Sequence, residues 1–277
     1  MPTTVQHPIS PRFVDTPTGT LAVVTLGQGE TDLVLWPSIF TDHSIHLGLA
    51  ERLGDRFRLH LVDGPGHGSS RSAPMVATMA DYAASMAAVL DALDLKAPIV
   101  GGTSWGGLVG AELALTQPDR VSGLVLMNTP MGIDGAQPVF ANRMIAFGAR
   151  WMLGLRLFRN GVARSFFEQP DADSGAMQHF HTMLAQADPA ALSAHVANVI
   201  LRGTPLRERL HQIAVPTAVI AGRDDTMYPV DQQAGAAVLL PMGRLYVVPG
   251  KHISAVDSPD LVAEAIGGLR FGQRIAA

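Results

Sequence analysis

The chain has 277 residues and a formal net charge of −4, with 47% hydrophobic and 16% charged residues. Its 20 basic residues form no run that could follow a phosphate backbone, which argues against a nucleic-acid partner. It has no stretch of about 18 to 20 apolar residues that would argue for a membrane partner, and no cysteine for a disulfide, a thiolate metal site or a cysteine nucleophile. The first residues lack the pattern of a secretory signal, so a globular cytoplasmic protein is expected.

The first half of the chain alternates short apolar runs with helical patterns. Strands are predicted at residues 21–26, 32–36, 58–63, 97–102 and 123–128, and helices at 44–54, 79–95 and 106–117. Several of the strands are apolar throughout, which is typical of strands covered on both faces. This alternation favours an α/β fold in which helices cover both faces of a mostly parallel sheet.

The alternation stops between residues 131 and 205, where helical patterns rich in Met, Phe and Ala replace the strands. Strands are predicted again at 216–222 and 244–250, and a last helix at 260–270. We therefore predict a core built from residues 1–130 and 206–277, with residues 131–205 as a helical insertion. Within it, residues 155–167 interleave three arginines with apolar residues. A helix with a solvated basic face is the simpler interpretation, and a membrane-surface or anion-binding role is the alternative.

Residues 102–106 read Gly-Thr-Ser-Trp-Gly, which is the G-x-S-x-G pattern of a nucleophile elbow. The pattern is short, but here a predicted buried strand enters it and an apolar helix leaves it. Such a turn needs small neighbours, here Gly102 and Gly106, and it places the Ser104 hydroxyl at a helix N-terminus that favours developing negative charge. The alternative is a glycine-rich turn in which Ser104 only caps the helix.

A serine hydroxyl needs a base to become a nucleophile, and the base needs an acid that orients it. Two carboxylates, Asp224 and Asp225, follow the predicted strand 216–222, and His252 follows the strand 244–250. The order serine, acid, histidine, with each residue just after a strand, agrees with the order found where a G-x-S-x-G elbow is catalytic. These placements predict Ser104 as the nucleophile and His252 as its base.

Four motifs together resemble the α/β-hydrolase superfamily over nearly the whole chain. They are GTSWGG at the elbow, DGPGHGSS at 63–70, GRDDTMYP in the acid loop and PGKHISAVDSP in the histidine loop. The resemblance implies a mostly parallel eight-stranded sheet and makes the helical insertion a cap over the site. It also implies that Asp225 is the acid of the triad, while Asp224 has a structural role in the turn.

Three other histidines, His43, His46 and His67, lie in or near these motifs. The resemblance places His67 in a structural loop, where turn hydrogen bonding is a simpler role than that of a second base. His43 and His46 lie near the predicted oxyanion loop, and either lining of the site or a surface position fits the sequence.

The oxyanion hole of this superfamily takes one backbone N–H from the residue after the nucleophile, here Trp105, and one from the loop after the third strand. That loop usually contains His-Gly and an apolar residue, whereas this chain has Pro37 and Ser38 followed by Ile39. Alignment on the strand makes Ile39 the second donor. A similar asparagine-serine-leucine variant occurs in 3-oxoadipate enol-lactonases, which favours lactone or ester substrates.

Substrate contacts are expected from both the oxyanion loop and the insertion. The candidates are Ser38, Phe40, Met131, Phe147 and Trp151, with Met144, Phe166 and Phe167 as further apolar side chains of the insertion. For the residues of the insertion, packing between cap and core is the competing interpretation.

We therefore expect a serine hydrolase that cleaves a carboxylic ester or lactone of a mainly apolar small molecule through an acyl-enzyme. No metal-ligand spacing, phosphate loop or dinucleotide fingerprint is present, so no cofactor and no metal are expected. A monomer and a homodimer are both compatible with the sequence. Because the fold does not fix the reaction, C–C bond hydrolysis, perhydrolysis, cofactor-free dioxygenation and a non-catalytic receptor stay open as alternatives.

Overall fold

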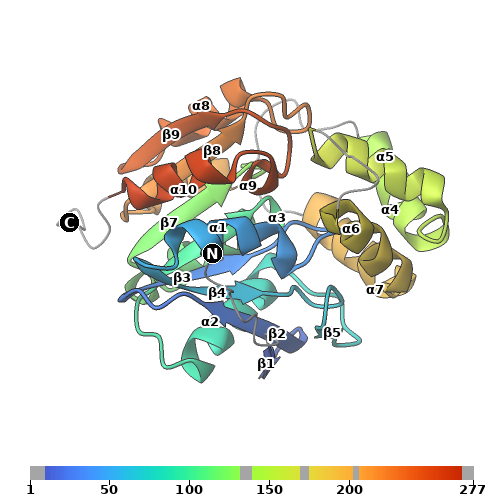
Figure 1. The fold of residues 1–277 in the computed structure, drawn as a ribbon, viewed down its shortest axis with the longest axis horizontal. Helices are drawn as coiled ribbons and strands as arrows, with labels where there is room; N and C mark the ends of the chain where they lie inside the picture. Colours follow the sequence, from blue (N-terminus) through green and yellow to red (C-terminus); the bar gives the residue numbers. More distant parts are fainter. Residues whose placement is uncertain (1–9, 132–138, 169–174, 202–205, 270–277) are drawn as a thin grey trace, which may run out of the picture.

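A computed structural model describes residues 10–131, 139–168, 175–201 and 206–269. At its centre lies one sheet whose main path joins eight strands in the order β1-β2-β4-β3-β6-β7-β8-β9, with the short β5 paired to β2 (Figure 1). The strands are β1 (Arg12–Thr16), β2 (Gly19–Leu26), β3 (Thr31–Trp36), β4 (Phe57–Val62), β5 (Arg71–Ser72), β6 (Ile99–Thr103), β7 (Gly123–Met127), β8 (Thr217–Gly222) and β9 (Gly243–Val248). Neighbouring strands from β4 to β9 are parallel, whereas β2 pairs antiparallel with β1, β4 and β5. The predicted mostly parallel α/β sheet is therefore confirmed.

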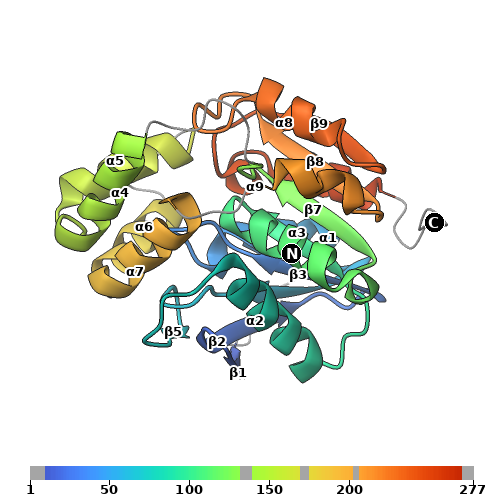
Figure 2. The same ribbon diagram turned by 180° about the vertical axis from the view of Figure 1, so that it is seen from behind.

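Helices cover both faces of this sheet. One face carries α1 (Leu47–Leu53), α9 (Ser254–Asp257) and α10 (Pro259–Gly267), and the other carries α2 (Met79–Ala92), α3 (Trp105–Thr116) and α8 (Val230–Ala237), as Figures 1 and 2 show from opposite sides. All five residues of β6 and of β7 are buried, as expected for central strands between two helical layers. Short 3-10 helices complete the core at His43–His46, Pro118–Arg120 and Arg207–Gln212.

Between β7 and β8, the described residues 139–168 and 175–201 form a group of helices that lie beyond one end of the sheet (Figures 1 and 2). They are α4 (Val139–Trp151), α5 (Arg156–Phe166), α6 (Gly175–Gln186), α7 (Pro189–Val196) and a π-helical turn at Ala197–Leu201, and we call this group the cap. In the described residues 139–168 and 175–201 there is no strand. The cap contacts the core at loops that follow β3 and β9, since His179 bonds Asp42 and Phe166 accepts from the Ile253 amide.

Four of these strands and α-helices of the core lie outside the pattern that the sequence predicts. β1 is a mostly exposed edge strand in which only Val14 is buried, β5 has only two residues, α8 is short and weakly apolar, and α9 has only four residues. The helix predicted over 79–95 ends at Ala92, because Asp94 adopts a φ of 56° that a helix cannot continue. At its start, Thr78 and Asp81 form a capping box.

Within the described ranges, no helix combines the length and apolar character that a membrane crossing requires.

Candidate active site

Ser104 occupies the sharp turn between β6 and α3. Its backbone has φ 54° and ψ −106°, which is a strained conformation for a residue with a side chain. The Ser104 amide donates to the Met127 carbonyl at 2.7 Å, which fixes the turn to the neighbouring strand β7. The hydroxyl makes no capping hydrogen bond to α3. The interpretation of Ser104 as an ordinary helix cap therefore does not fit this geometry.

Two glycines allow the elbow to pack directly on β3. A Cβ atom at Gly102 or at Gly106 would lie 1.9 Å from the Trp36 carbonyl oxygen, which is far inside any contact distance. Neither position can therefore carry a side chain without moving β3. This close approach brings the end of β3, and with it the loop that starts at Pro37, against the serine turn.

His252 and Asp225 form a buried pair on the loops that follow β9 and β8. The His252 Nδ1–H donates to Asp225 Oδ2 at 2.9 Å, and both side chains are buried. This bond fixes the tautomer in which Nε2 carries no proton, which is the form that accepts a proton from a hydroxyl. Asp224, by contrast, is exposed, and its amide donates to the Gly250 carbonyl at 3.0 Å. The structure thus brings Asp225, and not Asp224, to the histidine.

Further donors hold the Asp225 carboxylate in its ionised form. Asn128 Nδ2 donates to Oδ2 at 2.9 Å, and the Met227 amide donates to Oδ1 at 2.8 Å. Burial alone would raise the pKa of Asp225, but the hydrogen bond and charge of His252 and these two donors outweigh it and lower that pKa. Asp225 therefore stays a carboxylate that can stabilise a protonated His252.

Asn128 is a site residue that sequence reasoning missed. It follows β7 directly, and the Ser254 hydroxyl donates to its side-chain oxygen at 2.6 Å, which orients the amide nitrogen toward Asp225. A polar residue at the carboxyl end of a buried parallel strand is the signal that could have identified it, since ligand and catalytic groups gather at that edge.

The predicted oxyanion donors lie where the loop after β3 and the start of α3 meet the elbow. Trp105 is the first residue of α3, so its amide has no partner within the helix. Ile39 is buried, and within the described part of the chain its amide donates no hydrogen bond. The next residue, Phe40, has a φ of 66°, and its amide donates to His67 Nε2 at 3.3 Å.

His67 supports this loop from the 63–70 segment. Its Nδ1–H donates to the Pro65 carbonyl at 3.0 Å, which leaves Nε2 to accept from Phe40. Burial is the main cause that lowers the pKa of His67 and keeps the ring neutral. The structural role that the sequence favours for His67 therefore agrees with its contacts.

The other predicted substrate contacts lie in different environments. Ser38 is buried, and among the described residues its hydroxyl has no hydrogen-bond partner. Met131 belongs to the buried core. Phe147 and Trp151 lie exposed on the outer side of α4, so this arrangement does not support their prediction as pocket residues.

Phe166 is the cap residue that the structure brings to the histidine. Its ring centroid lies 5.1 Å from that of His252 and 6.3 Å from that of Phe40. Its carbonyl accepts from the Ile253 amide at 2.9 Å, which ties the end of α5 to the histidine loop. Phe166 therefore forms an apolar wall between cap and core.

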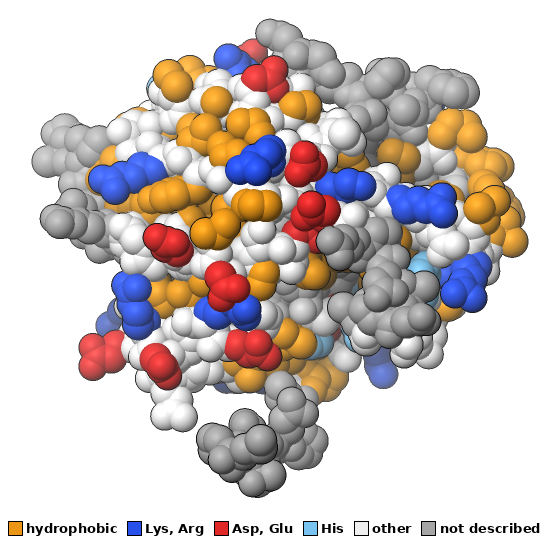
Figure 3. All heavy atoms as spheres, turned by 45° about the horizontal axis from the view of Figure 1, so that its top comes forward, with side chains coloured by type: hydrophobic (Ala, Val, Ile, Leu, Met, Phe, Trp, Pro, Cys, Tyr) orange, Lys and Arg blue, Asp and Glu red, His pale blue; other side chains and the backbone are white. Residues whose placement is uncertain are grey.

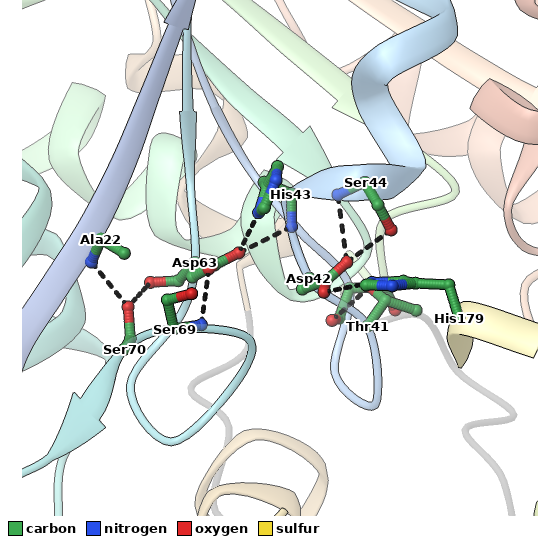
Figure 4. Close-up of polar contacts among 10 residues, drawn as sticks. Ala22, Thr41, Asp42, His43, Ser44, Asp63, Ser69, Ser70 and His179 are labelled. Carbon is green, nitrogen blue, oxygen red and sulfur yellow. Dashed lines mark hydrogen bonds and ion pairs between the residues drawn. The ribbon is translucent and has the colours of Figure 1, made fainter. Parts of the chain in front are cut away.

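His46 does not line the site, because it is buried behind the elbow with Nε2 3.0 Å from the Thr103 hydroxyl. His43 bonds Asp63 through Nδ1 at 2.8 Å, and Asp42 bonds His179 of the cap at 2.7 Å (Figure 4).

One group of described residues, Asp42, His43 and Asp63, has ligand atoms close enough to hold a metal ion. Each of these side chains already takes part in protein hydrogen bonds (Figure 4). The arrangement is satisfied as a hydrogen-bond network. A cleft of about 970 Å³ lies beside it, between α6, α7 and the 66–76 loop, and Ser104 and His252 are not among the residues that line it.

Comparison with known proteins gives consistent matches over nearly the whole chain. The family model of the alpha/beta hydrolase fold matches residues 33–259. The pimeloyl-[acyl-carrier protein] methyl ester esterase of Nitrosomonas europaea is 30% identical over 261 residues, covering 82% of this chain and 90% of the relative. The protein of the same name from Edwardsiella ictaluri is 30% identical over 266 residues, covering 91% and 97%.

Two solved structures match equally broadly. A hydrolase from Pseudomonas aeruginosa PA01 is 28% identical with a TM-score of 0.85, over 95% of this chain and 98% of the other. The enol-lactonase from Burkholderia xenovorans LB400 has a TM-score of 0.84 over 93% and 98%, and at 22% identity it shows similarity of fold alone.

Proposed function

Because this chain belongs to the α/β-hydrolase fold family and is an esterase-type enzyme, we propose that it cleaves an ester or lactone of a mainly apolar small molecule through an acyl-enzyme on Ser104. One observation carries the proposal. A serine in strained backbone geometry, whose hydroxyl does not cap its helix, lies on the same sheet edge as a buried His252–Asp225 pair. That combination supplies the nucleophile, the base and the acid that catalysis by a serine hydroxyl uses.

The first half of the reaction forms the acyl-enzyme. His252 Nε2 takes the proton of Ser104 as its Oγ attacks the substrate carbonyl, and the Ile39 and Trp105 amides donate to the oxyanion that forms. The carbon–oxygen bond of the ester then breaks, and the leaving alcohol takes the proton from His252. With a lactone, the alcohol stays attached to the acyl group.

The second half of the reaction releases the acid. Water gives a proton to His252 and attacks the acyl carbonyl, the same two amides stabilise the oxyanion, and Ser104 recovers its proton as it leaves. In both halves the Asp225 carboxylate stabilises the imidazolium form of His252 without taking the proton itself. No step needs a cofactor.

The surroundings of the proposed site support an apolar acyl or ring group. The Phe166 ring lies 5.1 Å from the His252 ring between centroids, and the Phe40 ring lies 6.3 Å from that of Phe166. The buried Ser38 hydroxyl offers one polar contact, which fits a substrate oxygen near the oxyanion loop. The esterase relatives are named for a methyl ester, so their leaving group is small.

A hydrolysis panel tests this proposal. Purified protein is assayed on p-nitrophenyl esters of increasing acyl length, on γ- and δ-lactones, and on bulky aryl esters, with Ser104→Ala as the blank. We expect turnover of at least one ester or lactone class by the wild-type protein and loss of that turnover in the variant. Failure on every class, or full activity in Ser104→Ala, would overturn the proposal.

A further inference from the structure

The outer side of α4 carries large apolar side chains and arginines together. Arg143, Met144, Phe147, Arg150 and Trp151 follow one another at spacings of one, three, three and one residues, which places them on one side of a helix. All five are exposed, and the three apolar side chains are 48%, 51% and 67% exposed in sequence order.

The same surface continues through the turn into α5. Leu155 and Leu157 are 53% and 78% exposed, and Arg156 lies exposed between them. We call these eight residues, from Arg143 to Leu157, the cap face. Single exposed apolar residues are ordinary, but a concentration of five large ones marks an interaction surface.

The charge of this region is of one sign. Residues 139–167 contain five arginines and no aspartate or glutamate, in a chain whose net charge is −4. The Arg150 guanidinium lies 4.6 Å from the centre of the Trp151 ring, so cation and aromatic ring are presented together. In Figure 3, hydrophobic and basic side chains lie together at the right-hand edge of the molecule, where α4 and α5 are.

We propose that the cap face docks the protein on an anionic phospholipid surface. Helices that lie in the membrane interface place Trp, Phe and Leu toward the acyl chains and Arg toward the anionic headgroups, which is the arrangement of the cap face. A phospholipid surface accepts protruding apolar side chains without matching pockets. This surface goes beyond the proposed catalytic function and does not depend on Ser104.

The charge of the cap face argues against a second copy of the chain as the occupant. A twofold contact would place the same surface against itself, and arginines 143, 150 and 156 would then face their own copies. An acidic protein would satisfy the arginines but would also need pockets for Trp151 and Leu157.

The sequence argues against a membrane partner because the chain lacks an apolar stretch long enough to span a membrane. Docking on the membrane surface needs no such stretch.

Tryptophan emission gives a direct probe of the proposed contact. The chain has three tryptophans, and Trp36 and Trp105 are fully buried, so Trp151 is the one whose environment changes when the cap face meets lipid. Purified wild-type protein is mixed with vesicles of phosphatidylglycerol and phosphatidylcholine, and separately with pure phosphatidylcholine vesicles. Sedimentation of the protein with the vesicles is measured in parallel at low and high salt.

We expect a blue shift of emission and co-sedimentation with the phosphatidylglycerol vesicles, weakened by salt and absent with phosphatidylcholine alone. The paired variants Leu155→Ser with Leu157→Ser, and Arg143→Glu with Arg156→Glu, should each weaken vesicle binding at least tenfold.

Val238→Ser with Arg244→Glu is the matched control, because both residues are exposed, Val238 directly after α8 and Arg244 on β9, away from the cap (Figure 1). It should bind the vesicles as the wild type does. Thermal unfolding of every variant shows whether it is folded.

Three results would overturn the proposal. The first is no binding of the wild-type protein to phosphatidylglycerol vesicles, including the case in which the cap face binds an acidic protein instead. The second is equal vesicle binding by folded cap-face variants. The third is a dimer in light scattering that the leucine variants dissociate.

Discussion

Asn128 and Asp225 are 97 residues apart in the chain and are joined by a hydrogen bond of 2.9 Å from the side-chain nitrogen Nδ2 of Asn128 to Asp225 Oδ2. The same oxygen accepts from His252 at 2.9 Å, so the carboxylate is fixed by two side chains at once. Asn128 has a φ of 48°, a conformation that Asn and Gly adopt more readily than other residues. The residue is therefore matched both to its backbone position and to its partner.

Asn128→Gly is expected to lower kcat about tenfold or more with little change in KM. The substitution keeps the positive φ and removes a donor to a charged group, which is worth about 1.5–3 kcal/mol. Loss of this donor also raises the pKa of Asp225. As the pH is lowered, the variant should therefore lose activity at a higher pH than the wild type does. Steady-state kinetics from pH 4 to 8 measure both effects, and a profile identical to that of the wild type would show that Asn128 does not position the acid.

Asp225→Asn is expected to lower kcat about 10⁴-fold, because the neutral amide no longer holds His252 in the reactive tautomer. Asp224→Asn is the matched control, since Asp224 is adjacent in sequence but exposed. It should keep nearly full activity on the same ester. A loss of activity in Asp224→Asn together with full activity in Asp225→Asn would reverse the assignment of the acid.

The sequence predicted the sheet and the positions of Ser104 and His252 because both depend on local signals. Buried parallel strands are apolar throughout, and polar residues that directly follow them gather at one sheet edge. Asn128 carried the same signal at the end of β7, but one amide has no motif that assigns it a role. Its partner, Asp225, is distant in the chain, so the contact exists only in the folded structure.

The cap shows where pattern reasoning fails. Helical spacing indicates that Phe147 and Trp151 share one side of α4, and an apolar side is ordinarily the buried one. In the structure the small residues Gly148 and Ala149 face the protein, while the large residues face outward. The Phe158 ring lies so close to Gly148 that a side chain at this position would collide with it. Periodicity gives the relative directions of side chains on a helix, but the packing of one helix on another decides which side is buried.

Gly106→Ala is expected to abolish stable folding or severely reduce the melting temperature, because the added Cβ would lie 1.9 Å from the Trp36 carbonyl oxygen. Gly161→Ala in the middle of α5 is the matched control, since nothing lies within 4 Å of its added Cβ. It should leave stability unchanged or raise it by about 0.5–1 kcal/mol through helix propensity. Thermal unfolding of both variants checks the contrast, and equal melting temperatures would contradict the close packing of the elbow on β3.

Stability is expected to fall as the pH drops below about 6.5, the ordinary histidine pKa, because buried histidines resist protonation, His46 and His195 among them. Burial is the main cause that lowers the pKa of His46 and of His195 to about 3, with nearby His43 and His67 adding to the effect. Above pH 6.5 these two histidines are neutral in both the folded and the unfolded chain, so they cause no loss of stability there. Between pH 6.5 and 3 the unfolded chain binds these protons and the folded chain does not, so unfolding is favoured.

The contribution of His195 can be measured separately. Its ring bonds the Tyr82 hydroxyl at 2.7 Å and Ser72 at 3.0 Å, so His195→Gln keeps a polar side chain there. The variant should have a lower free energy of unfolding than the wild type at pH 7. Its free energy of unfolding should also change less with pH, by about 1.4 kcal/mol per pH unit or less. Urea unfolding of both proteins at pH 7 and pH 5 gives the slope of the unfolding free energy against pH for each, and equal slopes would mean that His195 is protonated in the folded protein as it is in the unfolded chain.

The role of Ser104 is tested most directly by covalent labelling with diethyl p-nitrophenyl phosphate, followed by mass spectrometry of the digested protein. The proposed mechanism predicts one diethylphosphoryl group per chain on the peptide that contains Ser104, with release of one equivalent of p-nitrophenol and complete loss of esterase activity. His252→Ala should label far more slowly, because the hydroxyl then has no base. A fully active protein without an adduct, or an adduct on another residue that accounts for the loss of activity, would contradict the assignment of Ser104 as the nucleophile.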